Sequence, residues 1–109
     1  MSSSASDRRV LHQVARPPAA GDALARALAH ARAGDVLLLV QAAAPCACAS
    51  VALASELAVA LAQHDVHVLA ADLTARGLAG APLRAGVTAL DDPAWVALAA
   101  ACDVVVTWT

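Results

Sequence analysis

The chain has 109 residues, a formal net charge of −2 and 61% hydrophobic residues, many of them alanine. This length suits one domain. All basic residues are Arg and they are scattered along the chain, so the chain lacks the basic cluster that direct nucleic-acid binding requires. Any role in RNA chemistry must therefore be indirect.

The N-terminal segment and the cysteines indicate the compartment. Residues 1–8 are polar and charged without an apolar segment behind them, and we expect a disordered leader and no secretory signal. The three cysteines, an odd number, are then expected to be free thiols in a reducing, cytoplasmic compartment. Residues 36–55 are uncharged and long enough to cross a bilayer. Pro45 and two serines interrupt them, so a strand, a loop and a helix explain this run better than a membrane span.

Apolar runs and breakers predict elements throughout residues 9–109. A strand over Arg9–Ala15 ends at two prolines, and Asp22 suits the N-cap of a helix to about Arg32. Val36–Val40 is continuously apolar, as in a central parallel strand. A second helix is expected from about Ser50 to Gln63, with Ser50 as its cap. The remaining expected elements are a strand over Val66–Ala71, a polar link with a helical turn over Asp72–Gly80, a strand over Val87–Leu90, a helix with Asp92 as N-cap and Pro93 at its first position, and a strand over Asp103–Trp108.

This alternation of strands and helices predicts the fold class. We expect an α/β protein: a single three-layer domain with an open, mostly parallel sheet of about five strands and helices on both faces. The turn after the first strand lacks G-x-G-x-x-G, and without lysine the chain has no Walker A motif. The cysteines and histidines show no paired spacing for zinc. We therefore expect neither a cofactor nor a metal.

Two thiols, Cys46 and Cys48, are candidate reactive residues. If Ser50 begins a helix, both lie just before its N-terminus, where the positive end of the dipole favours thiolate. However, the spacing is C-x-C and not the C-x-x-C of redox pairs, and no basic residue adjoins them. Free cysteines in an Ala-rich loop can also be simple core residues. Both interpretations stay open.

The segment Asp72–Leu78 has a second set of candidates. Asp72 ends a predicted strand and can cap the following turn, and Arg76 can pair with it at i,i+4. Gly77 can take a left-handed conformation that stops the turn. A well-made helical turn explains these residues; the functional alternative is a polar surface for a partner, with Asp72, Arg76 and Gly77 at the interface.

Four segments, in this order and spacing, resemble the TusB/DsrH family of bacterial sulfur-relay subunits. Leu11-His12-Gln13-Val14 with Arg16 and Pro18 resembles the family's "LH-x-V-x-(K/R)-S-P" opening, and residues 34–39 resemble its "GD-x-LLL" strand. Residues 72–78 match "DL-x-ARG(L/F)" most specifically, and Cys102-Asp103 with Trp108 is similar to the final strand. The resemblance covers nearly all of the chain beyond the leader.

The resemblance implies a DsrEFH-like fold and a cytoplasmic heterohexamer with TusC/DsrF-like and TusD/DsrE-like subunits. Such complexes pass persulfide sulfur between carrier proteins, either toward 2-thiouridine at the tRNA wobble position or in dissimilatory sulfur oxidation. The sulfur-carrying cysteine belongs to the DsrE/TusD-type subunit. A cysteine that some DsrH members carry in the first helix corresponds to Ala27 here.

The favoured hypothesis is therefore a structural, accessory subunit of a TusBCD-type relay that supports tRNA thiolation, without direct contact with nucleic acid or membrane. The alternatives are a DsrEFH-type subunit in sulfur oxidation and a stand-alone sulfurtransferase or redox protein that uses Cys46 or Cys48.

Overall fold

A computed structural model describes residues 8–109 and contains one five-stranded sheet. The strands are β1 (Val10–Val14), β2 (Val36–Leu39), β3 (Asp65–Leu69), β4 (Val87–Leu90) and β5 (Val104–Trp108). They lie in the order β4-β3-β2-β1-β5, and every neighbouring pair is parallel. The predicted α/β class is confirmed. Residues 1–7 of the predicted leader lie outside the described residues.

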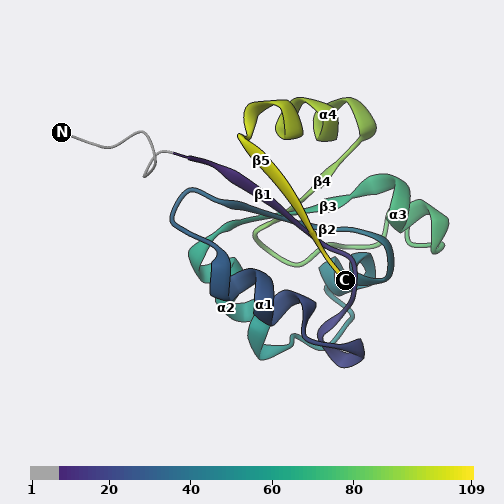
Figure 1. Ribbon diagram of the computed structural model, residues 1–109. Helices are drawn as coiled ribbons and strands as arrows, with labels where there is room; N and C mark the ends of the chain where they lie inside the picture. The colour runs from purple at the N-terminus through teal and green to yellow at the C-terminus, as the bar shows by residue number, and fades with distance from the viewer. Residues whose placement is uncertain (1–7) are drawn as a thin grey trace.

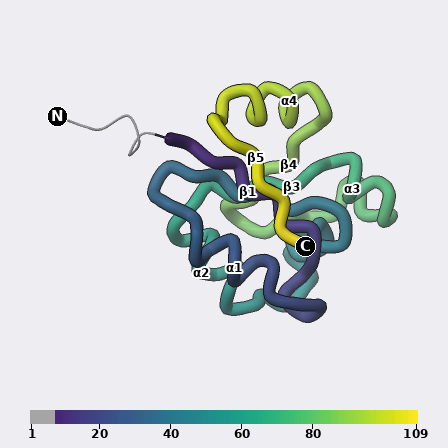
Figure 2. Tube along the Cα trace, in the orientation of Figure 1, coloured from purple at the N-terminus to yellow at the C-terminus, as the bar shows by residue number. Residues whose placement is uncertain are grey.

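Helices cover both faces of this sheet, as predicted. They are α1 (Ala23–His30), α2 (Ser55–Gln63), α3 (Ala70–Ala75), α4 (Asp92–Ala101) and the 3-10 helices η1 (Pro18–Ala20) and η2 (Gln41–Ala47). Figure 1 shows α1 and α2 together on one face and α4 on the other. The connections through α1 and α2 step from β1 toward β3, whereas α4 returns the chain to the far side of β1. Right-handed crossovers in opposite directions place their helices on opposite faces. Figure 2 shows β5 beside β1.

Each face has its own apolar core. On the α1 and α2 side, Leu24 and Leu57 pack with the sheet residues Leu37 and Val68. On the α4 side, the buried sheet residues are joined by partly buried residues of α4 such as Trp95. All four residues of β2 are buried, which explains why this strand is continuously apolar in sequence.

The predicted start of the second helix is wrong. β2 is followed by η2, and α2 begins at Ser55 and not at Ser50. The intervening segment is held by residues 82–84 instead: Cys48 forms an isolated antiparallel bridge with Leu83, and Arg84 N donates to Ala47 O at 2.9 Å. Its backbone groups are therefore satisfied by distant residues and not by a continuing helix.

The aspartate caps differ in part from prediction. Asp22 occupies the predicted N-cap position of α1, but its side chain makes no capping hydrogen bond; its Oδ1 accepts from Arg26 Nε at 3.0 Å, and α1 ends at His30. The cap of α4 is Asp91 and not Asp92, with Oδ1 accepting from Ala94 N at 2.9 Å. β3 ends at Leu69 and α3 begins at once, which places Asp72 within the first turn of α3 and not at the end of a strand.

Candidate functional site

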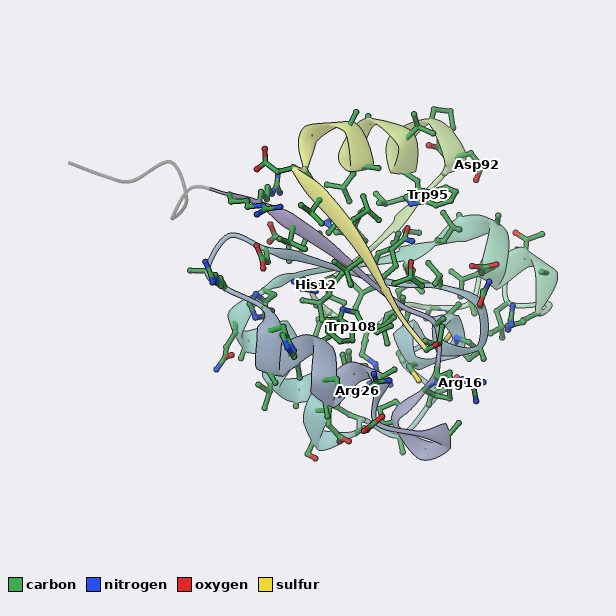
Figure 3. All side chains as sticks on the ribbon, viewed as in Figure 1. His12, Arg16, Arg26, Asp92, Trp95 and Trp108 are labelled. Carbon is green, nitrogen blue, oxygen red and sulfur yellow. The ribbon has the colours of Figure 1, made fainter. Side chains whose placement is uncertain are left out.

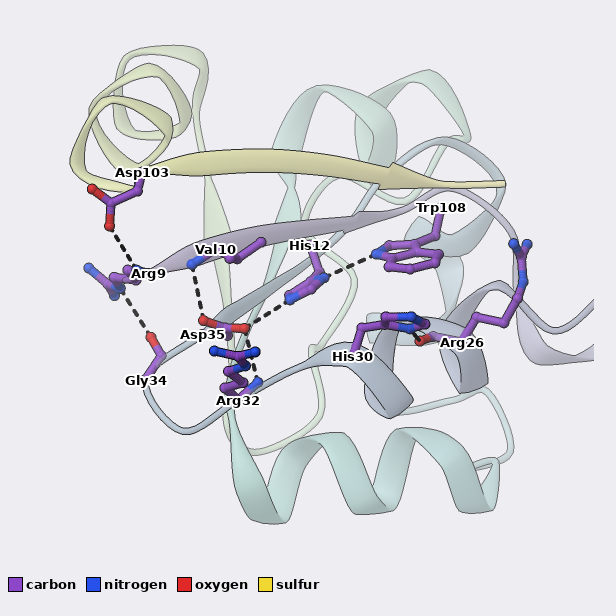
Figure 4. Close-up of polar contacts among 10 residues, drawn as sticks. All are labelled: Arg9, Val10, His12, Arg26, His30, Arg32, Gly34, Asp35, Asp103 and Trp108. Atoms are coloured by element: carbon purple, nitrogen blue, oxygen red, sulfur yellow. Dashed lines mark hydrogen bonds and ion pairs between the residues drawn. The ribbon is translucent and has the colours of Figure 1, made fainter. Parts of the chain in front are cut away.

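A buried polar network joins β1 to the loop before β2. Asp35 is 3% exposed and accepts three hydrogen bonds at 3.0 Å each, from Val10 N, Arg32 N and His12 Nε2 (Figure 4). Burial by itself raises the pKa of Asp35, but these hydrogen bonds outweigh it and lower the pKa below the ordinary value. Asp35 is therefore an ionised carboxylate at neutral pH.

The hydrogen bonds of His12 identify its tautomer. Its Nδ1 lies 3.0 Å from Trp108 Nε1, and an indole N–H can only donate. His12 Nδ1 is therefore the acceptor, and Nε2 carries the proton that is donated to Asp35. Because both ring nitrogens are engaged and the ring is 3% exposed, His12 is a structural residue in this arrangement and not a poised general base.

Trp108 connects this network to α1. The His30 ring lies 5.1 Å from the Trp108 ring between centroids, and the Arg26 guanidinium carbon lies 5.7 Å from the same centroid. Arg26 Nη2 also donates to Thr109 O at 2.6 Å. These contacts fix the end of β5 beside α1, and Figure 3 shows Trp108 and Arg26 in this region.

A pocket of about 370 Å³ opens at this end of the sheet. Its lining comes from the segments that follow β1, β2, α3 and β5, namely Ala15, Arg16, Pro17, Ala20, Gln41, Ala42, Arg76 and Thr109. Ligands of open α/β sheets usually bind beyond the carboxyl ends of the strands, where neighbouring connections leave in different directions. This pocket is the candidate functional site.

The predicted residues Asp72 and Arg76 both belong to the surroundings of the pocket, but they do not pair. Asp72 Oδ2 accepts a hydrogen bond from Gln41 N at 2.7 Å. This bond holds Gln41 at a φ of 50°, an unusual conformation for a residue other than glycine. The predicted Asp72–Arg76 ion pair is absent among the described residues. Asp72 therefore shapes the pocket wall, and Arg76 lines the pocket.

Gly77 closes α3 in the predicted left-handed conformation, with a φ of 71°. Gly77 N donates to Thr74 O at 3.0 Å and Leu78 N donates to Leu73 O at 2.8 Å. This pair of bonds is the usual glycine stop of a helix. It sets the direction in which the chain leaves Arg76.

The two candidate thiols lie away from the pocket lining. Cys48 is 1% exposed, and Cys46 is half-buried within η2. Burial raises the pKa of Cys46; the charge of Arg84 opposes this shift, and Cys48 adds to it. Neither thiol stands at the N-terminus of α2, so the expected helix-dipole activation is wrong. Arg84 does approach, but its Nε donates to the Cys46 carbonyl oxygen at 2.8 Å. Burial also raises the pKa of Cys102.

Among residues 8–109 there is no cluster of three or more His, Cys, Asp or Glu side chains suited to a metal ion. Within the same residues, no helix has the length and apolar character needed to cross a membrane.

Two important residues, Asp35 and Arg16, were not singled out from the sequence as site candidates. A signal for both exists, because Arg16 stands in the opening motif and Asp35 in the "GD" motif of the family resemblance. His12 and Trp108 also belong to these motifs. The network that joins Asp35, His12 and Trp108 appears only in three dimensions, and Arg16 lies outside it, in the lining of the pocket.

Comparisons with known proteins agree with this architecture. The family model described as DsrH like protein matches residues 16–105. The crystal structure of the ychN protein from E. coli is similar with a TM-score of 0.71 and 16% sequence identity, and the match covers 93% of this chain and 99% of that one. At this identity the likeness concerns the fold. No curated protein sequence matches.

Proposed function

This chain belongs to the DsrH-like family, and we propose that it is an accessory subunit of a cytoplasmic, TusBCD-type sulfur-relay complex. The family match over residues 16–105 supports a role in sulfur relay and carries the proposal. In the proposed relay, persulfide sulfur passes through partner subunits toward 2-thiouridine in tRNA. The partners are TusC/DsrF-like and TusD/DsrE-like subunits.

The positions of the thiols favour an accessory role over a sulfur-carrying one. A sulfur carrier needs an accessible thiol with a low pKa. Here Cys48 is buried, and burial raises the pKa of both Cys46 and Cys102. The carboxyl-end pocket has no cysteine among its lining residues. The reactive sulfur is therefore expected to come from another subunit.

The outer face of α4 favours assembly with other subunits. Residues 93–101 are apolar apart from the indole N–H of Trp95, which donates to Gln13 Oε1 at 2.9 Å, yet no residue of α4 is buried. The exposed positions Pro93, Val96, Ala97, Ala100 and Ala101 follow the i, i+3, i+4, i+7, i+8 spacing of one helix face, and Val96 is 64% exposed. Val105, on the same side of the sheet as buried Leu11, is 45% exposed. A helix that is apolar all round is typical of a covered helix.

Co-expression with the TusC-like and TusD-like subunits tests this proposal. We expect native mass spectrometry to detect a heterohexamer that contains two copies of this chain. Val96→Asp should abolish assembly while circular dichroism stays unchanged, because a charge would be buried in the interface. Val59→Asp is the matched control, since Val59 is a 45% exposed valine on α2. A chain that stays monomeric beside its co-expressed partners contradicts the proposal.

Nucleoside analysis tests the pathway. Deletion of the gene should remove 2-thiouridine from tRNA, and unchanged 2-thiouridine would favour the DsrEFH-type role in sulfur oxidation. Persulfide loading of the isolated chain tests the stand-alone alternative. Loading that is lost in the Cys46→Ser/Cys48→Ser double variant would favour a sulfurtransferase and contradict the accessory role.

A further inference from the structure

The charged side chains that line the carboxyl-end pocket are two arginines from separate segments. Arg16 follows β1, and Arg76 follows α3, 60 residues later in the chain. Both side chains are exposed. The fold therefore brings two positive charges to one concave site that the sequence spacing alone does not suggest.

Neither guanidinium group has a structural partner among residues 8–109. Other arginines are used to hold the fold: Arg9 Nε donates to Gly34 O at 3.2 Å, and Arg84 Nε donates to Cys46 O at 2.8 Å. No hydrogen bond or ion pair within the described part of the chain engages the side chain of Arg16 or Arg76. Their donors are therefore available to a ligand.

The nearby acidic and carbonyl groups are already engaged. Asp72 Oδ2 accepts from Gln41 N at 2.7 Å, and Asp72 is outside the lining of the pocket. Thr109 O, which belongs to a lining residue, accepts from Arg26 Nη2 at 2.6 Å. Arg26 thus adds a third positive charge beside the pocket, and it is balanced by Asp22 at 3.0 Å.

The remaining lining is small and mostly apolar. Ala15, Pro17, Ala20 and Ala42 are small and carry no side-chain hydrogen-bonding group. Such a lining suits a small ligand that is anionic at one end and weakly hydrated elsewhere. The guanidinium groups bind the anion, and the apolar walls exclude water from it.

We propose that Arg16 and Arg76 form a receptor for the anionic end of a sulfur donor, a persulfide or thiosulfate sulfur. That the anion is a sulfur species rests on the proposed function; the presence of an anion site rests on the pocket. The pocket holds the anion without forming a covalent bond, because no thiol lines it. In a relay it would hold a partner's persulfide in its anionic form.

Titration of the full, isolated chain tests the site by amide chemical shifts and calorimetry. Thiosulfate should shift the amides of Arg16, Gln41 and Arg76 and bind more tightly than sulfate or chloride at equal ionic strength. Arg16→Gln or Arg76→Gln should each weaken thiosulfate binding by about tenfold, the effect of losing a charged hydrogen bond. Arg32→Gln is the matched control, because Arg32 is an exposed arginine outside this pocket.

A second titration distinguishes a free donor from a persulfide on a larger molecule. Glutathione persulfide is compared with S-methylglutathione, which carries the same carboxylates without the sulfur anion. Tighter binding of the persulfide that depends on both arginines supports a partner's persulfide as the ligand. Preference for thiosulfate alone assigns the site to a free donor.

Two outcomes overturn the inference: thiosulfate binding that is unchanged in the Arg16→Gln/Arg76→Gln double variant, or binding no tighter than that of chloride. Failure of the anion site can be told apart from failure of the proposed function. A chain that assembles with its sister subunits but binds no sulfur anion retains the proposed function and loses only this inference.

Discussion

Asp35 is the residue that joins the amino-terminal ends of β1 and β2 and that connects them, through His12 and Trp108, to β5. It holds the start of β1 through Val10 N, the loop before β2 through Arg32 N, and β5 through His12 and Trp108. A buried anion is stable here because three donors replace its lost water. This single residue therefore connects the family's opening, "GD" and tryptophan motifs physically.

Replacing Asp35 with Asn should destabilise the protein by about 3 kcal/mol. The amide lacks the charge, and in either orientation its NH₂ group would face a donor: Val10 N in one orientation, or Arg32 N and the N–H of His12 in the other. Urea denaturation at pH 7 measures the loss. Asp103→Asn is the control: its carboxylate is exposed and accepts one bond, from Arg9 N at 2.8 Å. Equal losses in the two variants would contradict the role of the network.

The effect of Asp35 should also depend on pH in a defined direction. The pKa of Asp35 in the folded protein is lowered from the ordinary value of 3.8. The stabilisation is therefore complete above that value and is lost as the pH falls through the lower, folded-state pKa. The stability difference between the wild type and Asp35→Asn should shrink below about pH 4.

At the scale of the elements, the sequence predicted strands better than helix starts. A short, continuously apolar run such as β2 predicts a central strand, and the prediction holds because all four residues of β2 are buried. The start of α2 could not be predicted, because residues 82–84 hold the chain after η2. The cap of α4 was misplaced by one residue because two adjacent aspartates, Asp91 and Asp92, suit the role equally in sequence. In the structure, the extended backbone of Asp91, with ψ at 173°, and its hydrogen bond from Ala94 N distinguish them.

This distinction predicts different effects for two neighbouring substitutions. Asp91→Ala removes the hydrogen bond to Ala94 N and should lower the free energy of unfolding by about 1 kcal/mol. Asp92→Ala should change it by less than about 0.5 kcal/mol, because the better helix propensity of alanine offsets the lost interaction with the helix dipole. Thermal denaturation of both variants checks this order, and a larger effect at Asp92 would contradict the assignment of the cap.

At the scale of the molecule, the candidate site arises from topology. Arg16, Gln41, Arg76 and Thr109 are far apart in sequence, and they meet because parallel strands end at the same edge. The sequence could identify Arg76 from its local motif, but no local pattern relates it to Arg16. Cys46 and Cys48 were candidates because of a local sequence pattern, but the topology does not bring them to the site. Cys46 lies in η2 and Cys48 in the bridge that follows it, and neither lines the pocket.

The same topology predicts an uneven distribution of local stability. β2 lies at the centre of the sheet and is buried throughout, whereas α4 has no buried residue and lies over one face near the edge strand β5. In native-state hydrogen exchange, β2 amides should open only with global unfolding, and α4 amides should exchange at least about tenfold faster through local opening. Addition of the sister subunits should slow exchange in α4 and leave β2 unchanged, since α4 has an uncovered apolar face to bury whereas β2 is already buried. If α4 is as protected as β2 in the isolated chain, its outer face needs no partner, and the main structural support for assembly is removed.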